Sequence, residues 1–288
     1  MESRMDLLGK VALITGGTRG IGLEVATRLA DRGADLILGY KKDIENATRA
    51  KEIIEGKGRR VQLISSDLRK PPGVDALFEE VKSGLDRIDI LVLNAAFGTM
   101  GEVARMGRYS WRASYDTNVL SPMLTAKGAL PWLKRNGGVI TAISTLGAHT
   151  AYPTYVAIGS SKAALESLVK YISFEWAKYG VRANAVAAGP VETRAIDWFR
   201  FPDAVRIFTA RKGLAGRMGL PSDIAEVATW LCTDESRWLY GQSVVAEGGI
   251  LLGVDYDEWS DENIDSAQLT EAAEATQAAS SAVQGGAS

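Results

Sequence analysis

The sequence predicts an α/β protein with a single domain, built on a doubly wound parallel sheet of seven strands. Two observations lead to this fold class. Short apolar runs alternate along the chain with segments of helical length, and strict alternation of strand and helix produces a parallel sheet with right-handed crossovers. A glycine-rich turn also follows the first apolar run, where a helix is expected to begin.

Seven apolar runs are interpreted as strands. Each is short and nearly continuous, as expected for strands that are buried on both faces of a parallel sheet. Between them lie helical patterns such as residues 20–33 and 162–180, and in the second of these apolar residues recur three and four positions apart. The expected strands cover residues 11–15, 35–40, 60–65, 88–94, 138–144, 181–187 and 243–249.

The composition changes near Gly253. The chain has 288 residues, of which 46% are apolar, and this is enough for one large α/β domain. Residues 254–288 hold eight acidic residues and no lysine or arginine, and they end in a stretch rich in Ala, Ser, Gln and Gly. Such a segment has too little apolar surface to offset the entropy lost on ordering. We therefore expect a folded domain at residues 1–253 and an acidic, mostly disordered tail at residues 254–288.

Several classes of protein are disfavoured by the sequence. It contains no run of about 18 apolar residues, the length that a membrane-spanning helix needs. The first ten residues lack the apolar core of a secretory signal. One cysteine, Cys232, and one histidine, His149, provide neither an internal disulfide nor a zinc site of ordinary ligand spacing. The sequence thus indicates a cytoplasmic protein with metal-free chemistry.

The turn after the first expected strand has the pattern of a phosphate-binding loop. Residues 15–22 read TGGTRGIG and are followed by a helical pattern. We expect Gly16 to make the turn, Gly20 to let the backbone approach a phosphate, and Gly22 to let helix and strand pack closely. The free N–H groups and the positive dipole at the start of the helix favour an anion there. Three glycines alone are weak support, but the strand-turn-helix context is the one that such a loop requires.

This spacing resembles the TGxxxGIG motif of the short-chain dehydrogenase/reductase superfamily, whose members have a Rossmann-type fold. Three further segments match that family at the expected distances, and together the matches span residues 8–253. They are Asp67 after the third strand, residues 94–98 (NAAFG) after the fourth, and residues 189–193 (GPVET) after the sixth. The resemblance implies a dinucleotide bound by Gly16, Thr18, Arg19, Gly20, Ile21, Gly22, Tyr40, Lys41, Asp67, Leu68, Asn94, Ala95, Lys162, Gly189, Pro190, Val191 and Thr193.

The preferred dinucleotide is predicted from the end of the second strand. NAD enzymes usually carry a carboxylate there, which binds the ribose hydroxyls and repels a 2′-phosphate. In this chain the strand ends in Tyr40, Lys41 and Lys42, and the first acid is Asp43. With Arg19, the lysines would place two or three cations around a 2′-phosphate, so the pattern predicts NADPH. The alternative is that the lysines only solubilise a loop.

Tyr155 and Lys162 are the expected catalytic pair. A nearby ammonium is expected to lower the pKa of a phenol, which makes the pair a proton donor. Most members of the superfamily place the two residues four apart, but here they are seven apart and position 158 is Ile158. On a helix, a separation of seven keeps both residues on one face but about 10 Å apart along the axis. The alternative is that Tyr155 is an ordinary aromatic residue at a helix start.

The displaced tyrosine resembles that of the enoyl-acyl-carrier-protein reductases, most closely the NADPH-dependent type III enzymes, which share the Tyr-x6-Lys pattern. A ketone receives hydride on the carbon that bears its oxygen, whereas an enoyl thioester receives it on the β-carbon, farther from the oxygen that becomes negative. A more distant acid suits the second case. The resemblance therefore implies NADPH-dependent reduction of an enoyl thioester, in fatty-acid or specialised acyl biosynthesis.

Other site residues are less sharply defined. Ser144 matches the superfamily's Ser-x-x-G and would help bind the substrate carbonyl, although the adjacent Thr145 is an alternative. Asn118 resembles the helix asparagine that holds a water beside the lysine, or else it is a buried amide that bonds across a helix bend. His149 is expected at the mouth of the pocket. The substrate is expected to contact Phe97, Tyr152, Trp198 and Phe199, the last two within the segment 192–219 where the family keeps its lid.

Two alternatives to an enoyl reductase remain open. A ketoreductase or alcohol dehydrogenase of the same fold would use Tyr155 against a carbonyl on the carbon that accepts hydride. A non-catalytic NADPH-binding regulator would use the acidic tail to recruit a partner, although Ser144, Tyr155 and Lys162 would then be kept without a use. The expected partners are a small acyl thioester, with an acyl carrier protein as its candidate carrier, and further copies of the chain in a homotetramer. Neither nucleic acid nor a membrane is expected.

Overall fold

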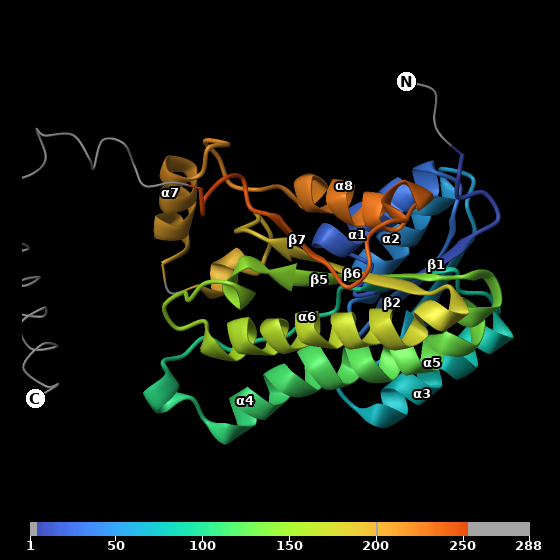
Figure 1. The fold of residues 1–288 in the computed structure, drawn as a ribbon, viewed down its shortest axis with the longest axis horizontal. Coiled ribbons are helices and arrows are strands. Elements are labelled where there is room, and N and C mark those ends of the chain that lie inside the picture. The colour runs from blue at the N-terminus through green and yellow to red at the C-terminus, as the bar shows by residue number, and fades with distance from the viewer. Residues whose placement is uncertain (1–4, 200, 253–288) are drawn as a thin grey trace, which may run out of the picture.

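The computed structural model describes residues 5–199 and 201–252. The predicted tail at residues 254–288 lies outside this part of the chain. A seven-stranded parallel sheet crosses the middle of the molecule with helices on both faces (Figure 1). The predicted fold class is confirmed, and all seven expected strands are present. Their bounds are Val11–Thr15 (β1), Asp35–Tyr40 (β2), Val61–Ser65 (β3), Ile90–Leu93 (β4), Val139–Thr145 (β5), Arg182–Ala188 (β6) and Ser243–Ala246 (β7).

The strand order is β3-β2-β1-β4-β5-β6-β7. Strands β1, β2, β4, β5 and β6 are buried almost throughout, which explains their continuous apolar sequences. The order reverses between β1 and β4, because the chain first winds outward to β3 and then returns past β1. In open α/β sheets, ligands bind beyond the carboxyl ends of the strands at such a reversal.

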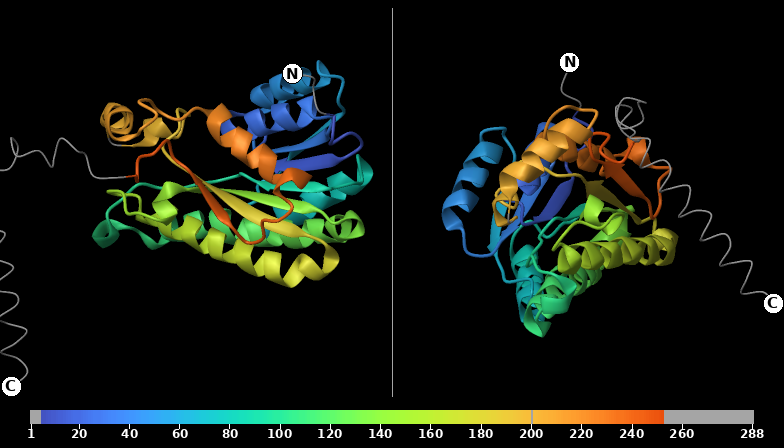
Figure 2. Two further views of the ribbon diagram at one scale, coloured as in Figure 1. Left: turned by 45° about the horizontal axis from the view of Figure 1, so that its top comes forward. Right: turned by 90° about the vertical axis from the view of Figure 1, so that its left-hand side faces the viewer.

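Two apolar cores lie on either side of the sheet. One is formed with the helices Gly20–Asp31 (α1), Ile44–Glu55 (α2) and Pro221–Leu231 (α8). The other is formed with Pro71–Ser83 (α3), Ser121–Asn136 (α5) and Val156–Trp176 (α6). The two views of Figure 2 show the same separation of the helices into two layers. Each helix therefore needs apolar residues on one side only, at the three- and four-residue spacing seen in the sequence.

Two further helices surround the carboxyl ends of the strands. Arg108–Tyr115 (α4) continues into a π-helical turn, Asp116–Leu120 (η2), and then into α5. Pro202–Lys212 (α7) follows β6 and belongs to the predicted lid segment, residues 192–219. It lies at the far left of Figure 1, beyond the sheet. Proline occupies the first positions of α3, α7 and α8, where its missing N–H leaves no helical hydrogen bond unmade.

Candidate active site

The glycine turn has the geometry that a dinucleotide loop requires. Gly16 and Gly20 have φ values of +63° and +55°, in the left-handed region that favours glycine. A Cβ at Gly22 would lie 2.3 Å from the Gly16 carbonyl oxygen and 2.5 Å from the amide nitrogen of Asn94. The helix α1 can therefore approach β1 and β4 only with glycine at this position. The loop fits the pyrophosphate of a dinucleotide, because it brings bare backbone N–H groups to a helix start.

Asn94 stabilises the glycine loop through hydrogen bonds to its backbone. Its side-chain amide donates to the carbonyl oxygens of Thr15 at 3.0 Å and Gly16 at 2.9 Å. The backbone N–H groups of Asn94 and Ala95 both donate to the Thr15 hydroxyl, which in turn donates to the carbonyl of Val92. The adjacent strands β1 and β4 are thus joined, just beyond their carboxyl ends, by hydrogen bonds from the side chains of Thr15 and Asn94.

The predicted phosphate pocket contains an ion pair that the sequence analysis did not foresee. Lys41 Nζ lies 2.9 Å from the Asp67 carboxylate, so the two predicted cofactor residues bond to each other. Burial raises the pKa of Asp67, but the hydrogen bond and charge of Lys41 outweigh it and the net direction is downward. Arg19, at the cap of α1, lies near Asp43 and contributes to lowering the pKa of that carboxyl, after the larger effect of hydrogen bonds from Asn46.

The segment after β6 closes the other side of the loop. The methyl group of Thr193 is 3.8 Å from the position that a Cβ of Gly20 would occupy. The Gly189 N–H donates to Ala246 on β7, and a Cβ on Gly189 would collide with Glu247 at 2.8 Å. The structure thus brings the predicted residues of the first and sixth turns together across the carboxyl edge of the sheet.

Tyr155 caps the amino end of α6, and its ring is partly buried. Its ring lies against Gly147 and Gly159, since a Cβ at Gly147 would be 2.6 Å from it. Phe199 of the lid segment stacks on the ring with centroids 5.7 Å apart. Thr145 Oγ1 lies 3.4 Å from the phenol oxygen. Burial raises the pKa of Tyr155, and the hydrogen bond with Thr145 lowers it by less.

The structure places Thr145 next to the Tyr155 phenol. Successive side chains of a strand point to opposite faces, and the buried Ser144 side chain points to α6, where its hydroxyl donates to Glu166. The role of Ser144 at the substrate carbonyl stays a prediction. The sequence analysis had weighed Thr145 as the alternative, but the face that each residue occupies depends on the strand's register against α6.

Lys162 is buried inside α6, and its ammonium donates to the Ile143 carbonyl at 2.6 Å. Burial lowers the pKa of Lys162 to about 8, and the negative charge of Glu166 opposes that shift. The expectation that Lys162 lowers the pKa of the Tyr155 phenol is not met in this structure, where the causes of the Tyr155 shift are burial and Thr145. The physical reason is that Lys162 lies about two helical turns beyond Tyr155, with its ammonium directed to the β5 backbone.

Asn118 is fully buried in the π-helical turn. Its amide donates to the Phe97 carbonyl at 2.8 Å and to the Ser161 hydroxyl at 2.9 Å, and its side-chain oxygen accepts from the Phe97 N–H at 3.0 Å. Of the two sequence interpretations, these contacts match the buried amide at a helix bend. Asn118 therefore holds the segment after β4 against α6.

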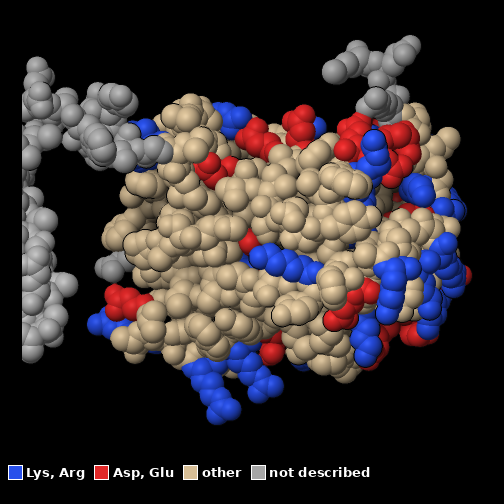
Figure 3. All heavy atoms as spheres, in the orientation of Figure 1, with Lys and Arg blue, Asp and Glu red and all other residues tan. Residues whose placement is uncertain are grey.

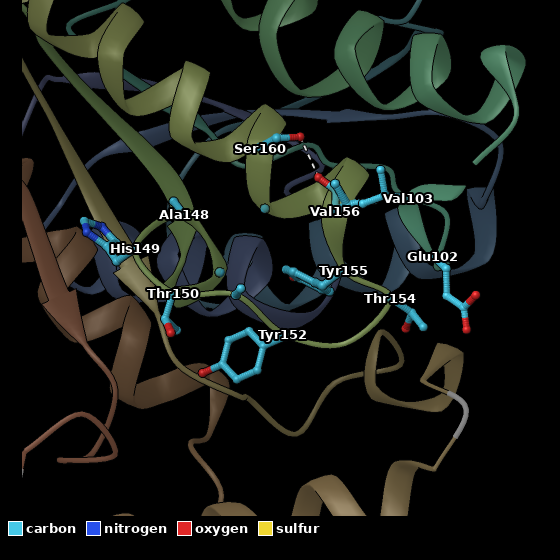
Figure 4. Close-up of a pocket in the computed structure, with 14 residues that line it drawn as sticks. Glu102, Val103, Ala148, His149, Thr150, Tyr152, Thr154, Tyr155, Val156 and Ser160 are labelled. Atoms are coloured by element: carbon cyan, nitrogen blue, oxygen red, sulfur yellow. Dashed lines mark hydrogen bonds between the residues drawn. The ribbon is translucent and has the colours of Figure 1, made fainter. Parts of the chain in front are cut away.

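A cavity of about 420 Å³ opens beside Tyr155 (Figure 4). Tyr152, Tyr155 and His149 line it, together with Glu102 and Val103 from the segment that follows β4. Tyr152 packs edge-on against Tyr155 with centroids 6.1 Å apart. Of the four predicted substrate residues, Tyr152 lines this cavity and Phe199 stacks on Tyr155, whereas Phe97 and Trp198 do not line it.

One residue that the sequence analysis did not place in the site emerges from the structure. Glu166 is buried one helical turn after Lys162, and one of its carboxylate oxygens lies 3.0 Å from Nε2 of His149, which was expected at the mouth of the pocket. The signal was present in the sequence, because positions four apart share one face of a helix. Within residues 5–199 and 201–252, no three His, Cys, Asp or Glu side chains are grouped as a metal site would need. In the same part of the chain, no helix is both long and apolar enough to span a bilayer.

Comparison with known proteins agrees with this geometry. Residues 16–251 match a family model described as Enoyl-(Acyl carrier protein) reductase. The chain is 34% identical over 248 residues to 1-cyclohexenylcarbonyl-CoA reductase from Streptomyces collinus, covering 84% of this chain and 87% of that protein.

Solved structures lead to the same group of proteins. A putative short-chain alcohol dehydrogenase from Sinorhizobium meliloti is 29% identical, with a TM-score of 0.82 over 87% of this chain and 100% of the other. An angucycline C-6 ketoreductase with bound NADP is 30% identical, with a TM-score of 0.80 over 86% and 98% of the two chains.

Proposed function

Because the chain belongs to the short-chain dehydrogenase/reductase superfamily, we propose that it is an NADPH-dependent reductase of the carbon-carbon double bond of an enoyl thioester. The observation that carries the proposal is the place of Tyr155 at the cap of α6, seven residues before Lys162. At the intermediate position stands Ile158, which packs so closely on Gly98 that a Cβ there would be 2.0 Å from it. A nearer phenol is thus replaced by an apolar side chain.

NADPH, when bound, supplies a hydride to the β-carbon of the substrate. Tyr155 donates a hydrogen bond, and then its proton, to the thioester oxygen that becomes negative, and the resulting enol tautomerises to the saturated thioester. Thr145 orients the phenol from the end of β5. Lys162, released from the Ile143 carbonyl, binds the ribose of the cofactor through its ammonium. The burial of Tyr155 and Lys162 excludes water and strengthens these charge interactions.

The support for a thioester substrate comes from the cavity and from one relative. The cavity beside Tyr155 is lined by Val103, Tyr152 and Gly159 of α6, which suits an acyl group. The Streptomyces collinus relative acts, by its name, on an acyl-CoA. A ketoreductase is the second candidate, favoured by the likeness to the NADP-bound angucycline C-6 enzyme.

One assay separates the two candidates. NADPH oxidation is followed with crotonyl-CoA and acetoacetyl-CoA in parallel, and each is repeated as the acyl-carrier-protein thioester. An enoyl reductase consumes NADPH with the crotonyl thioester and leaves the acetoacetyl thioester almost untouched. The opposite order would establish the ketoreductase. NADPH binding without turnover of either thioester would favour the non-catalytic regulator.

We expect Thr145→Ala to lower turnover more than Ser144→Ala does. Thr145 lies beside the phenol, whereas the Ser144 hydroxyl is bonded to Glu166, farther along α6. Loss of one hydrogen bond to the reacting group corresponds to about 10-fold or more in kcat. The measurement is kcat for both variants at pH 7. A larger loss in Ser144→Ala would show that β5 presents its other face to the substrate.

Cofactor preference is expected to depend on Arg19 and Lys41. Neutral replacements of both should weaken NADPH by about 1.5–3 kcal/mol per charged hydrogen bond lost, with little change for NADH. Because Lys41 also pairs with Asp67, Arg19→Gln alone is expected to weaken NADPH binding more than Lys41→Gln alone. The readout is the ratio of the two dissociation constants, and Lys42→Gln is the matched control. Equal weakening of both cofactors would contradict a role at the 2′-phosphate.

We also propose that the protein is a homotetramer that uses α6 as one of its contact helices. Tyr171 and Phe174 on α6 are 64% and 84% exposed, and Trp238 before β7 is 92% exposed. Figure 3 shows that this face is largely uncharged, while charged residues gather at the end of the molecule opposite α7. Light scattering of the wild-type protein should give four times the chain mass, and Phe174→Asp should lower it. A monomeric wild-type protein would contradict the proposal.

A further inference from the structure

Three polar side chains from three segments meet beside Lys162, and the proposed reaction uses none of them. Glu166 lies on α6, Ser144 is the next-to-last residue of β5, and His149 follows the short helix Leu146–Ala148 in the loop that leads to Tyr155. The Ser144 hydroxyl donates to one oxygen of the Glu166 carboxylate, and His149 Nε2 lies 3.0 Å from the other. His149 is the chain's single histidine, and it is partly open to the cavity (Figure 4).

Glu166 and Lys162 are both buried, with 7% and 4% of their surfaces exposed. A buried charge is unfavourable unless it is paired and hydrogen-bonded. Glu166 follows Lys162 by four residues on α6, so the two side chains share one face of the helix. Burial lowers the pKa of Lys162, and Glu166 is the charge that raises it again. The carboxylate oxygens are in turn held by the two donors, Ser144 and His149.

Other charged groups near α6 are directed elsewhere. In η2, which packs on α6, Asn118 is uncharged and Asp116 lies 3.5 Å from Arg112. On β6, Arg182 donates to the carbonyl oxygens of Thr233 and Ser236. Tyr155, at the cap of α6, is an uncharged phenol bonded to Thr145. Within the described residues, Glu166 is therefore the one charge with a resolved effect on the Lys162 ammonium.

We propose that Glu166, held in place by Ser144 and His149, is a positioning residue that keeps the Lys162 ammonium charged for cofactor binding. The same contacts tie the loop that carries Tyr155 to helix α6, through His149. This inference rests on the proposed role of Lys162 at the cofactor ribose. It assigns a use to the buried carboxylate, which the reaction itself does not require.

NADPH binding measured against pH tests the proposal without any acyl substrate. Dissociation constants are determined by cofactor fluorescence from about pH 7 to about pH 10, above the range in which the 2′-phosphate itself titrates. In the wild-type protein, affinity should fall as the pH rises through about 8, the pKa of Lys162. In Glu166→Gln the fall should move to lower pH by about one pH unit or more. At pH 8 that variant should then bind NADPH about 5-fold more weakly than the wild-type protein.

The control is Glu175→Gln, which removes an exposed carboxylate from the same helix and should leave the pH dependence unchanged. Glu166→Asp, which keeps the charge, should restore much of the wild-type profile. His149→Leu removes one donor from the carboxylate and should shift the profile in the same direction by less, which provides a second test if Glu166→Gln folds poorly. An identical profile in Glu166→Gln and Glu175→Gln would overturn this proposal alone. Failure of the wild-type protein to bind NADPH would overturn the proposed function as well.

Discussion

Tyr155→Phe is expected to lower kcat by about 100-fold or more while leaving the dissociation constant of NADPH nearly unchanged. The substitution removes the phenol oxygen and keeps the ring, so the packing on Gly147, Gly159 and Phe199 is preserved. The fall in kcat would therefore measure the loss of the proton donor and not a loss of folding. Turnover of the crotonyl thioester and cofactor fluorescence are the two measurements.

Tyr152→Phe is the matched control, because Tyr152 lines the same cavity and packs edge-on against Tyr155. It should retain most of the activity. A large fall in kcat in Tyr152→Phe, with a small fall in Tyr155→Phe, would show that Tyr152 is the proton donor.

The pH profile of activity adds a further check. Burial raises the pKa of the Tyr155 phenol, so the acid stays protonated at alkaline pH. Activity should instead decline as the pH rises through about 8, where Lys162 loses its charge.

Gly22→Ala should abolish cofactor binding and destabilise the fold. The new Cβ would lie 2.3 Å from a backbone oxygen and 2.5 Å from the Asn94 amide, and the backbone atom cannot turn away as a flexible side chain would. Overpacking of this kind costs about 1–3 kcal/mol. It also displaces Asn94, which holds the loop through the Thr15 and Gly16 carbonyls. The expected result is a lower melting temperature together with an NADPH affinity reduced by about 100-fold or more.

The control for this substitution is Gly107→Ala. Gly107 caps α4 with φ of −71°, and no atom lies within 4 Å of the Cβ that alanine would add. It should melt and bind NADPH like the wild-type protein. If Gly22→Ala also bound NADPH normally, the close packing of α1 on the sheet would not be needed for the cofactor.

The sequence was sufficient to predict the strands and the glycine turn, because each depends on local pattern. Burial on both faces produces apolar runs, and a left-handed turn needs glycine whatever surrounds it. The pairing of Lys41 with Asp67 was not predicted, although both follow strands that become neighbours, β2 and β3. That contact depends on the lengths of two side chains across the sheet edge, which pattern alone does not determine.

The choice between Ser144 and Thr145 is a second case in which the sequence pattern does not determine which side chains meet. A shift of one residue in a strand moves a side chain to the opposite face of the sheet. The motif places a hydroxyl near the end of β5, but the face that turns to Tyr155 depends on how α6 and its preceding loop sit on the strand. The stacking of Phe199 on Tyr155 depends on the path of the lid segment, which carries no periodic signal.

That stacked ring has a consequence for which substrates can be used. The described structure has Phe199 over the catalytic phenol at 5.7 Å, so an acyl group that takes this place must first displace an aromatic contact worth about 0.5–1.5 kcal/mol. A long or cyclic acyl group regains that energy by covering the exposed rings itself. A four-carbon group does not, so its apparent affinity should be reduced in proportion to the fraction of molecules in which the ring has moved aside. We therefore expect Phe199 to favour long or cyclic acyl groups over short ones.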